Sequence, residues 1–85
     1  MENLIFRVTR SFGADEHGRI ILDGVVEQGE PEPGQLVAVE LINGDVKMTH
    51  IDAVELHAHR DGSVGVKLTL PDGGPVPPGV LVRGR

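Results

Sequence analysis

Apolar side chains recur at every second position over most of this chain, and glycine, proline and asparagine separate one such run from the next. A period of two is typical of β-strands with one buried face, because successive side chains of a strand point to opposite faces. The clearest runs are Leu4, Phe6 and Val8, which Phe12 continues, and Val64, Val66, Leu68 and Leu70. No stretch has the 3.6-residue period of a helix. The chain is therefore predicted to be all-β.

The runs predict six strands, at residues 4–9, 19–27, 35–42, 46–56, 63–70 and 80–82. Pro33-Gly34 fits the middle of a tight turn before the third strand. Asn43-Gly44 predicts a hairpin after it, because both residues tolerate positive φ. Gly24 interrupts the second strand, and an internal glycine often marks a bulge or a barrel corner.

The fourth run contains a conflict between its two faces. One parity of this run holds Val46, Met48, His50, Asp52, Val54 and Leu56. His50 and Asp52 are unsuited to a core face, and the apolar Ile51 lies on the other parity. A bulge or bend near residues 50–53 would resolve the conflict, and could divide the run into two strands. A hydrogen bond between His50 and Asp52 would then satisfy two inward polar groups.

Six short strands in a chain of 85 residues leave sheet edges that must be protected. Open edges template aggregation, and closure into a barrel removes them. The apolar fraction of 39% is enough for one core. Residues 1–85 are therefore predicted to form a single domain, a small closed six-stranded antiparallel barrel.

Charge and composition narrow the range of partners. The net charge is −5, with 8 Lys and Arg against 13 Asp and Glu, and there is no Trp or Tyr. Because nucleic-acid binding depends on cations that contact phosphates and on aromatic stacking, autonomous binding of RNA or DNA is not expected.

The chain also has no cysteine and no apolar run long enough to cross a membrane as a helix. Its N-terminus lacks the basic start and apolar stretch of a signal peptide. We therefore expect a cytoplasmic protein without membrane contact.

Few residues could carry chemistry. His57 and His59 lie two positions apart, so on a strand they would face the same way and could bind Zn²⁺, Cu²⁺ or Ni²⁺, with Glu55 or Asp61 as a further ligand. The alternative, which we favour, is a polar solvent face before the Asp61-Gly62 turn.

Two further groups have simpler explanations. His17 stands beside Asp15 and Glu16, as an acid-flanked base or metal ligand would, but no serine or cysteine is placed to complete a triad. Glu30 and Glu32 flank Pro31 and could act as an acid and a base, yet an exposed loop favours simple solvation. We expect no catalytic activity and no cofactor.

Six segments, in order, resemble the second domain of translational GTPases such as elongation factor Tu. They are the apolar strand that ends in Phe12, GRIILDGVVEQG at 18–29, PGQLVAV at 33–39, VKMTHIDAVE at 46–55, SVGVKL at 63–68 and VPPGVLV at 76–82. Each segment alone is weak, but together they cover nearly the whole chain. The resemblance implies a closed six-stranded barrel that acts through its surface, on factor or ribosomal surfaces or on the acceptor end of an aminoacyl-tRNA.

The chain departs from that family in ways that limit what can be carried over. It contains no G-x-x-x-x-G-K-[ST] loop, so nucleotide binding by that mechanism is not expected. Leu70-Pro71-Asp72 replaces the basic segment that often follows the fifth strand in the family.

The predicted function is a non-catalytic module that binds a protein partner or a small ligand. Its contacts are expected in the loops 11–18 and 71–79, because loops on rigid barrels carry function and proline-rich loops are already ordered. The predicted contact residues are Asp15, His17, Arg19, Pro75, Pro77 and Pro78. Three alternatives stay open: a metal-binding accessory protein that uses His57 and His59, a ribosome- or tRNA-associated factor that acts with a larger partner, and a small self-associating protein.

Overall fold

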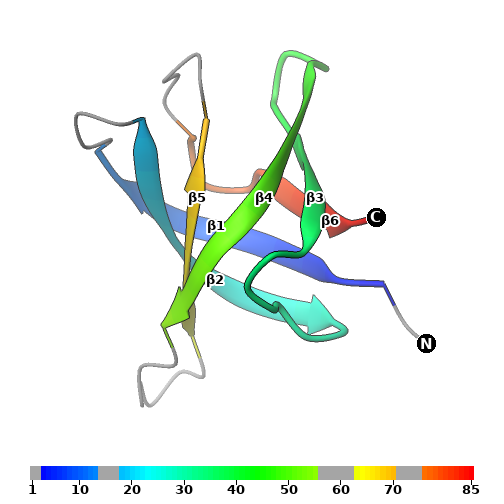
Figure 1. Ribbon diagram of the computed structural model, residues 1–85. Coiled ribbons are helices and arrows are strands. Elements are labelled where there is room, and N and C mark those ends of the chain that lie inside the picture. The colour runs from blue at the N-terminus through cyan, green and yellow to red at the C-terminus, as the bar shows by residue number, and fades with distance from the viewer. Residues whose placement is uncertain (1–2, 14–17, 56–62, 71–75) are drawn as a thin grey trace.

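Six strands close into an antiparallel barrel in the order β1-β2-β5-β4-β3-β6, and β6 pairs with β1 (Figure 1). The computed structural model describes residues 3–13, 18–55, 63–70 and 76–85. The strands are β1 Ile5–Phe12, β2 Arg19–Gln28, β3 Leu36–Glu40, β4 Val46–Glu55, β5 Val64–Thr69 and β6 Leu81–Gly84. No helix occurs in these ranges. The predicted all-β six-stranded barrel is confirmed.

The antiparallel order gives the barrel two distinct ends. At one end β2, β4 and β6 finish and β1, β3 and β5 begin, so the described residues before β1 and after β6 also lie at this end (Figure 1). The connection between β2 and β3 belongs to this end. The hairpin between β3 and β4 belongs to the other end, together with the residues that follow β1 and β5. The two ends therefore present different sets of loops.

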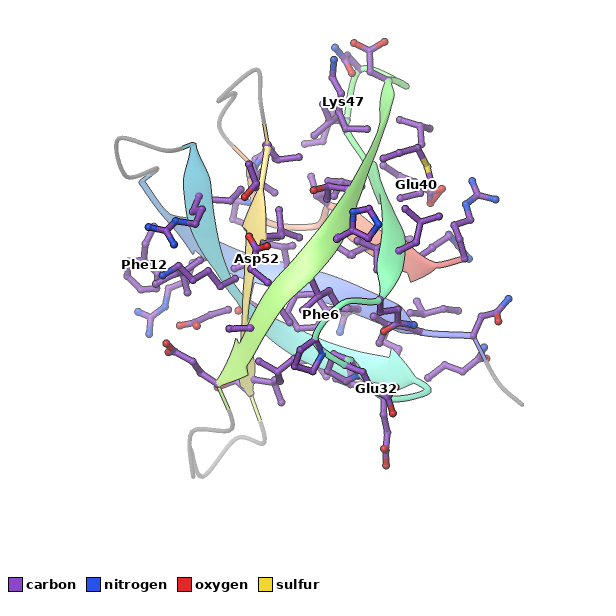
Figure 2. The ribbon with its side chains drawn as sticks, in the orientation of Figure 1. Phe6, Phe12, Glu32, Glu40, Lys47 and Asp52 are labelled. Carbon is purple, nitrogen blue, oxygen red and sulfur yellow. The ribbon has the colours of Figure 1, made fainter. Side chains whose placement is uncertain are left out.

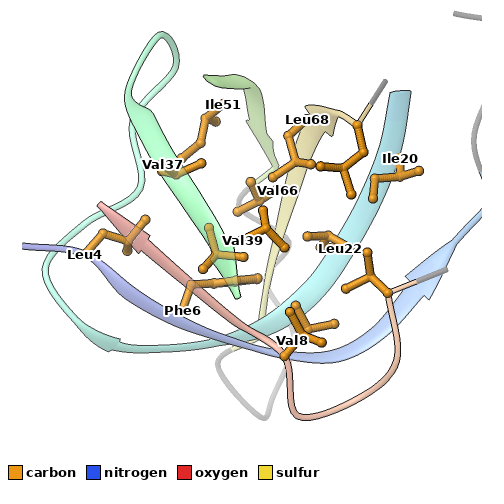
Figure 3. Close-up of a cluster of buried hydrophobic side chains, with 14 residues drawn as sticks. Leu4, Phe6, Val8, Ile20, Leu22, Val37, Val39, Ile51, Val66 and Leu68 are labelled. Carbon is orange, nitrogen blue, oxygen red and sulfur yellow. The ribbon is translucent and has the colours of Figure 1, made fainter. Parts of the chain in front are cut away.

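The core consists of the inward residues of all six strands and of the segments beside them (Figure 3). Its largest fully buried side chains are Phe6, Leu4, Leu22, Ile51, Leu68, Val8, Val37, Val39, Val66, Val80 and Val82. Both of the clearest alternating runs thus supply the core, as predicted.

Gly24 marks a close approach of two strands, although the bulge itself lies on the facing strand. Val8 pairs with Gly24 and Arg10 pairs with Asp23, so Thr9 is the extra residue of β1. A Cβ atom on Gly24 would lie 2.1 Å from the carbonyl oxygen of Arg7. Only glycine lets the two backbones approach this closely.

The same bulge corrects the expectation for Phe12. A bulge adds one residue to the alternation, so the parity of Leu4, Phe6 and Val8 does not continue through Thr9. Phe12 pairs with Ile21 and is 46% exposed on the outside of the barrel.

Two of the predicted turns occur, and the third, at Asp61-Gly62, lies outside the described residues. The Glu32 carbonyl accepts a hydrogen bond from the Gln35 N–H at 3.1 Å around Pro33-Gly34, and Gly34 has a φ of 85°. The β3–β4 hairpin also forms, but its loop has three residues, because the Leu41 N–H donates to the Asp45 carbonyl at 2.8 Å.

This hairpin loop uses one left-handed residue and not two. Gly44 has a φ of 92°, whereas no described residue other than glycine has a positive φ. The side-chain oxygen of Asn43 accepts a hydrogen bond from the Asp45 N–H at 3.0 Å, which stabilises the loop without a left-handed Asn43.

The predicted bulge in the fourth run is confirmed. Ile51 pairs with Leu68 and Ala53 pairs with Lys67, so Asp52 is the extra residue. β4 nevertheless stays one strand, which pairs with β3 as far as His50 and with β5 from Ile51 onward.

The polar residues of this run do not face inward, as the predicted His50–Asp52 hydrogen bond would require. His50 and Asp52 are both exposed, and Asp52 accepts a hydrogen bond from the Thr69 hydroxyl at 2.9 Å. Val46 and Met48 share their parity and are exposed as well, at 50% and 49%.

Candidate functional site

An apolar groove of about 560 Å³ opens at the end of the barrel where β2 and β4 finish and β5 begins. Its described lining residues, called here the barrel-end groove, are Val26, Gly29, Glu30, Pro31, Pro33, Val54 and Val64. Val26, Val54 and Val64 are partly buried and pack against the core. The floor of the groove is therefore an extension of the core toward solvent.

The proline-containing wall of the groove is held in one conformation. The Gly34 N–H donates to the Ile51 carbonyl at 2.7 Å, and the Glu32 N–H donates to the side-chain oxygen of Gln35 at 3.2 Å. Pro31 and Pro33 have their φ angles restricted by their rings. A wall that is already ordered loses little conformational entropy when a ligand binds.

The rim of the groove is acidic. Glu30 lines it, and Glu32 lies between the two prolines of the same connection, where Figure 2 labels it. Both residues are exposed, and neither has an ion pair with another described residue. The described lining contains no lysine or arginine. A cationic group beside this rim would therefore gain Coulombic attraction that no described residue already supplies.

The groove can bind, but its described residues offer no catalytic chemistry. Glu30 is the one titratable side chain among the described lining residues. General acid–base or nucleophilic catalysis needs a second group within hydrogen-bond reach of the first. The Glu30 and Glu32 pair considered above is exposed on the rim, as the solvated alternative predicts.

The described residues that flank the two loops predicted to contact a partner lie together at the opposite end of the barrel. The Ser11 hydroxyl donates to the Val76 carbonyl at 2.8 Å, and the Leu70 N–H donates to the Gly18 carbonyl at 3.1 Å. The described ends of both loops are thus neighbours, although more than fifty residues separate them in the chain.

Only part of the predicted contact set can be located. Arg19 is the first residue of β2, and Pro77 and Pro78 precede β6, with Pro78 exposed. Asp15, His17 and Pro75 lie outside the described residues. A contact role for this set stays a prediction.

The structure does not describe most of the predicted metal ligands. His57, His59 and Asp61 lie outside the described residues, and Glu55 is the exposed last residue of β4. Among the residues that the structure describes, no three His, Cys, Asp or Glu side chains are grouped as metal ligands would be. The histidine hypothesis stays a prediction that a Zn²⁺ titration followed by NMR would test.

Sequence reasoning missed the barrel-end groove. Its described walls come from the end of β2, the connection after it, the end of β4 and the start of β5, and alternation alone does not say which strand ends meet. The one available signal was Glu30-Pro31-Glu32-Pro33, a rigid acidic connection next to an apolar strand.

Comparison of this chain with protein-family models, with curated proteins and with solved structures finds no match. In the described part of the chain no helix is long and apolar enough to cross a membrane. The strand pairing establishes a closed six-stranded barrel. The resemblance to the second domain of translational GTPases stays a prediction.

Proposed function

We propose that this protein is a non-catalytic binding module whose barrel-end groove takes an apolar side chain from a protein partner. The observation that carries the proposal is the groove itself, an apolar hollow of about 560 Å³ with an ordered wall. Binding sites in proteins are concave, largely apolar and usually preformed, with volumes of roughly 300–1,000 Å³.

The acidic rim defines the chemistry of the partner segment. An apolar anchor enters the groove, and lysine or arginine residues beside the anchor approach Glu30 and Glu32. The net charge of −5 steers such a cationic segment toward the protein and disfavours an acidic one.

The resemblance to the second domain of translational GTPases supports a function exerted by the surface. In that family the barrel packs on factor or ribosomal surfaces, and this chain has the same order of strand and turn segments over nearly its whole length. The closed six-stranded barrel is compatible with the resemblance. Since a fold does not imply a function, the groove carries the proposal and the resemblance only accompanies it.

A peptide titration tests the proposal. Three synthetic peptides share one length: leucine flanked by lysines, leucine flanked by glutamates, and alanine flanked by lysines. We expect the first to shift the methyl resonances of Val26, Val54 and Val64 with a Kd on the order of 100 μM. The second and third should bind at least about tenfold more weakly, through charge repulsion and through loss of the anchor.

Matched variants show whether the groove is responsible. Val54→Thr and Val64→Thr keep the shape of the side chain and add a hydroxyl to the groove, which should weaken binding by roughly tenfold. Val46→Thr makes the same change on the outside of the barrel and should leave binding unchanged. Equal binding of all three peptides, or an equal effect of Val46→Thr, would refute the proposal.

One surface feature favours the ribosome- or tRNA-associated alternative. The guanidinium of Arg10 lies 5.4 Å from the centre of the Phe12 ring, and Phe12 is 46% exposed. An exposed aromatic ring with an arginine over it can stack on a base. Binding of a single-stranded oligonucleotide at physiological salt, lost in Phe12→Ala, would establish this alternative.

A further inference from the structure

Four large apolar side chains are exposed together on the β3–β4 hairpin. The hairpin patch consists of Leu36, Ile42, Val46 and Met48, which are 40%, 73%, 50% and 49% exposed. Among the described residues, Phe12 is the one other large apolar side chain with comparable exposure. Contiguous exposed apolar side chains of this kind mark interaction sites on soluble proteins.

The strand register places Leu36, Val46 and Met48 of the hairpin patch on one outer face, and Ile42 belongs to the loop that joins the two strands. Glu40 pairs with Val46, Ala38 with Met48 and Leu36 with His50, and directly paired residues of antiparallel strands lie on the same face. Ala38 is fully buried, although it shares this outer face with Met48 and Arg83. The side chains around Ala38 therefore cover it and form a continuous layer outside the barrel.

One ion pair lies beside the patch. The Arg83 Nε lies 2.6 Å from a Glu40 carboxylate oxygen, and the two side chains are 45% and 37% exposed. Glu40 and Arg83 lie on the outer face of β3 and β6, next to Val46 and Ala38 (Figure 2 labels Glu40). The adjacent ion pair thus attracts neither an anionic nor a cationic partner.

We infer that the hairpin patch binds a second copy of this chain in a two-fold symmetric dimer. A two-fold interface brings the same surface of both copies together, so that surface must complement itself. An apolar strip beside one acid and one base meets this condition, because the rotation can place Glu40 of each copy opposite Arg83 of the other. A partner with net charge would find no such complement here.

The size of the patch implies a weak dimer. A standard interface covers roughly 800 Å² on each partner, or about 15% of the 5215 Å² that this chain exposes. Four apolar side chains and one ion pair cover less than that. We expect a Kd on the order of 100 μM, as in small transient interfaces.

Sedimentation equilibrium with interference optics measures the association without needing Trp or Tyr absorbance. We expect the wild-type chain to pass from monomer to dimer between about 10 μM and about 1 mM. Met48→Lys and, as a second variant, Leu36→Lys should each raise the Kd by at least about tenfold, because each places a charge in the apolar strip.

Control variants distinguish association through the hairpin patch from nonspecific association. Phe12→Lys changes a side chain of matching exposure outside the patch and should leave the Kd unchanged. Glu40→Arg should weaken the dimer by placing four cations together, and Glu40→Arg with Arg83→Glu should restore it. A monomer at every concentration, or a Phe12→Lys effect equal to that of Met48→Lys, would overturn the inference.

Discussion

The two halves of β4 serve different surfaces, and the bulge at Asp52 separates them. Before the bulge, Val46 and Met48 point outward into the hairpin patch. After it, Val54 pairs with the inward Val66 and lines the barrel-end groove. The same residue type, valine, therefore belongs to a convex surface in one half and to a hollow in the other.

The charges around the two regions differ as much as their shapes. The groove has Glu30 and Glu32 on its rim with no ion pair among the described residues, whereas the patch adjoins the Glu40–Arg83 pair. Unbalanced charge selects a partner of opposite sign, and balanced charge permits self-association. Two apolar regions of one small barrel are thus suited to two kinds of partner.

The largest effect is expected from a substitution that destabilises the whole barrel, because the groove and the hairpin patch both depend on it. Gly24→Ala puts a Cβ atom 2.1 Å from the Arg7 carbonyl oxygen and 2.8 Å from the Phe6 ring, so the strands must separate. We expect the free energy of unfolding to fall by about 3 kcal/mol or more, with loss of groove binding and of dimerisation together. Urea denaturation followed by circular dichroism measures this. Gly13→Ala, where nothing lies within 4 Å, is the control and should change little.

Two single-residue deletions test whether the bulge separates the regions. Deleting Asp52 leaves one outward residue, Ala53, between the inward Ile51 and Val54, so both regions should persist. The expected loss is about 1 kcal/mol, from the hydrogen bond with Thr69.

Deleting Thr49 has a different consequence, because it lies in the regular part of the ladder with β3. The deletion turns Val46 and Met48 away from the hairpin patch and puts Met48 in the position of Thr49, opposite the fully buried Val37. Because the larger side chain crowds the core and the hydrogen bond from Thr49 to the Thr69 carbonyl is lost, we expect the protein to be destabilised by about 3 kcal/mol or more. Urea denaturation of both deletion variants, with solvent relaxation of the Met48 methyl resonance, measures the contrast. Equal destabilisation by the two deletions would show that the bulge does not divide the strand.

Salt should separate the two kinds of binding. Raising NaCl from about 0.05 M to about 0.5 M should weaken the cationic peptide at the groove by roughly three- to tenfold, since exposed charges are screened. The dimer should change by less than about twofold, because apolar contact dominates it. NMR titration and sedimentation at both salt concentrations give the two values, and a parallel decrease would remove the distinction.

The smallest expected effect concerns the stability of the monomer. Glu40→Gln removes an exposed ion pair and should lower the free energy of unfolding by about 0.5 kcal/mol or less. The same variant should raise the dimer Kd severalfold, because each copy loses a partner for Arg83 of the other. Denaturation at low micromolar concentration and sedimentation at high concentration separate the two effects. A decrease in stability with an unchanged Kd would place the ion pair outside the interface.

Local patterns predicted much of the fold correctly. The turns at Pro33-Gly34 and at Asn43-Gly44, and the bulge near Asp52, follow from residue types that act within a few positions of themselves. The prediction that Phe12 continues the inward parity of β1 was wrong. The bulge at Thr9 exposes Phe12, and no residue type within β1 indicates that bulge. The residue that marks the bulge, Gly24, lies on the facing strand.

The sequence by itself determined the all-β class, the number of strands and their closure, because alternation and turn chemistry are local and a chain this short must bury its edges. Only the tertiary structure decided which apolar residues stay at the surface. Closure brings Val26, Val54 and Val64 to one barrel end as a groove, and the register of β3 on β4 leaves Val46 and Met48 outside. Both outcomes depend on pairings between distant segments, and a pattern of period two contains no information about them.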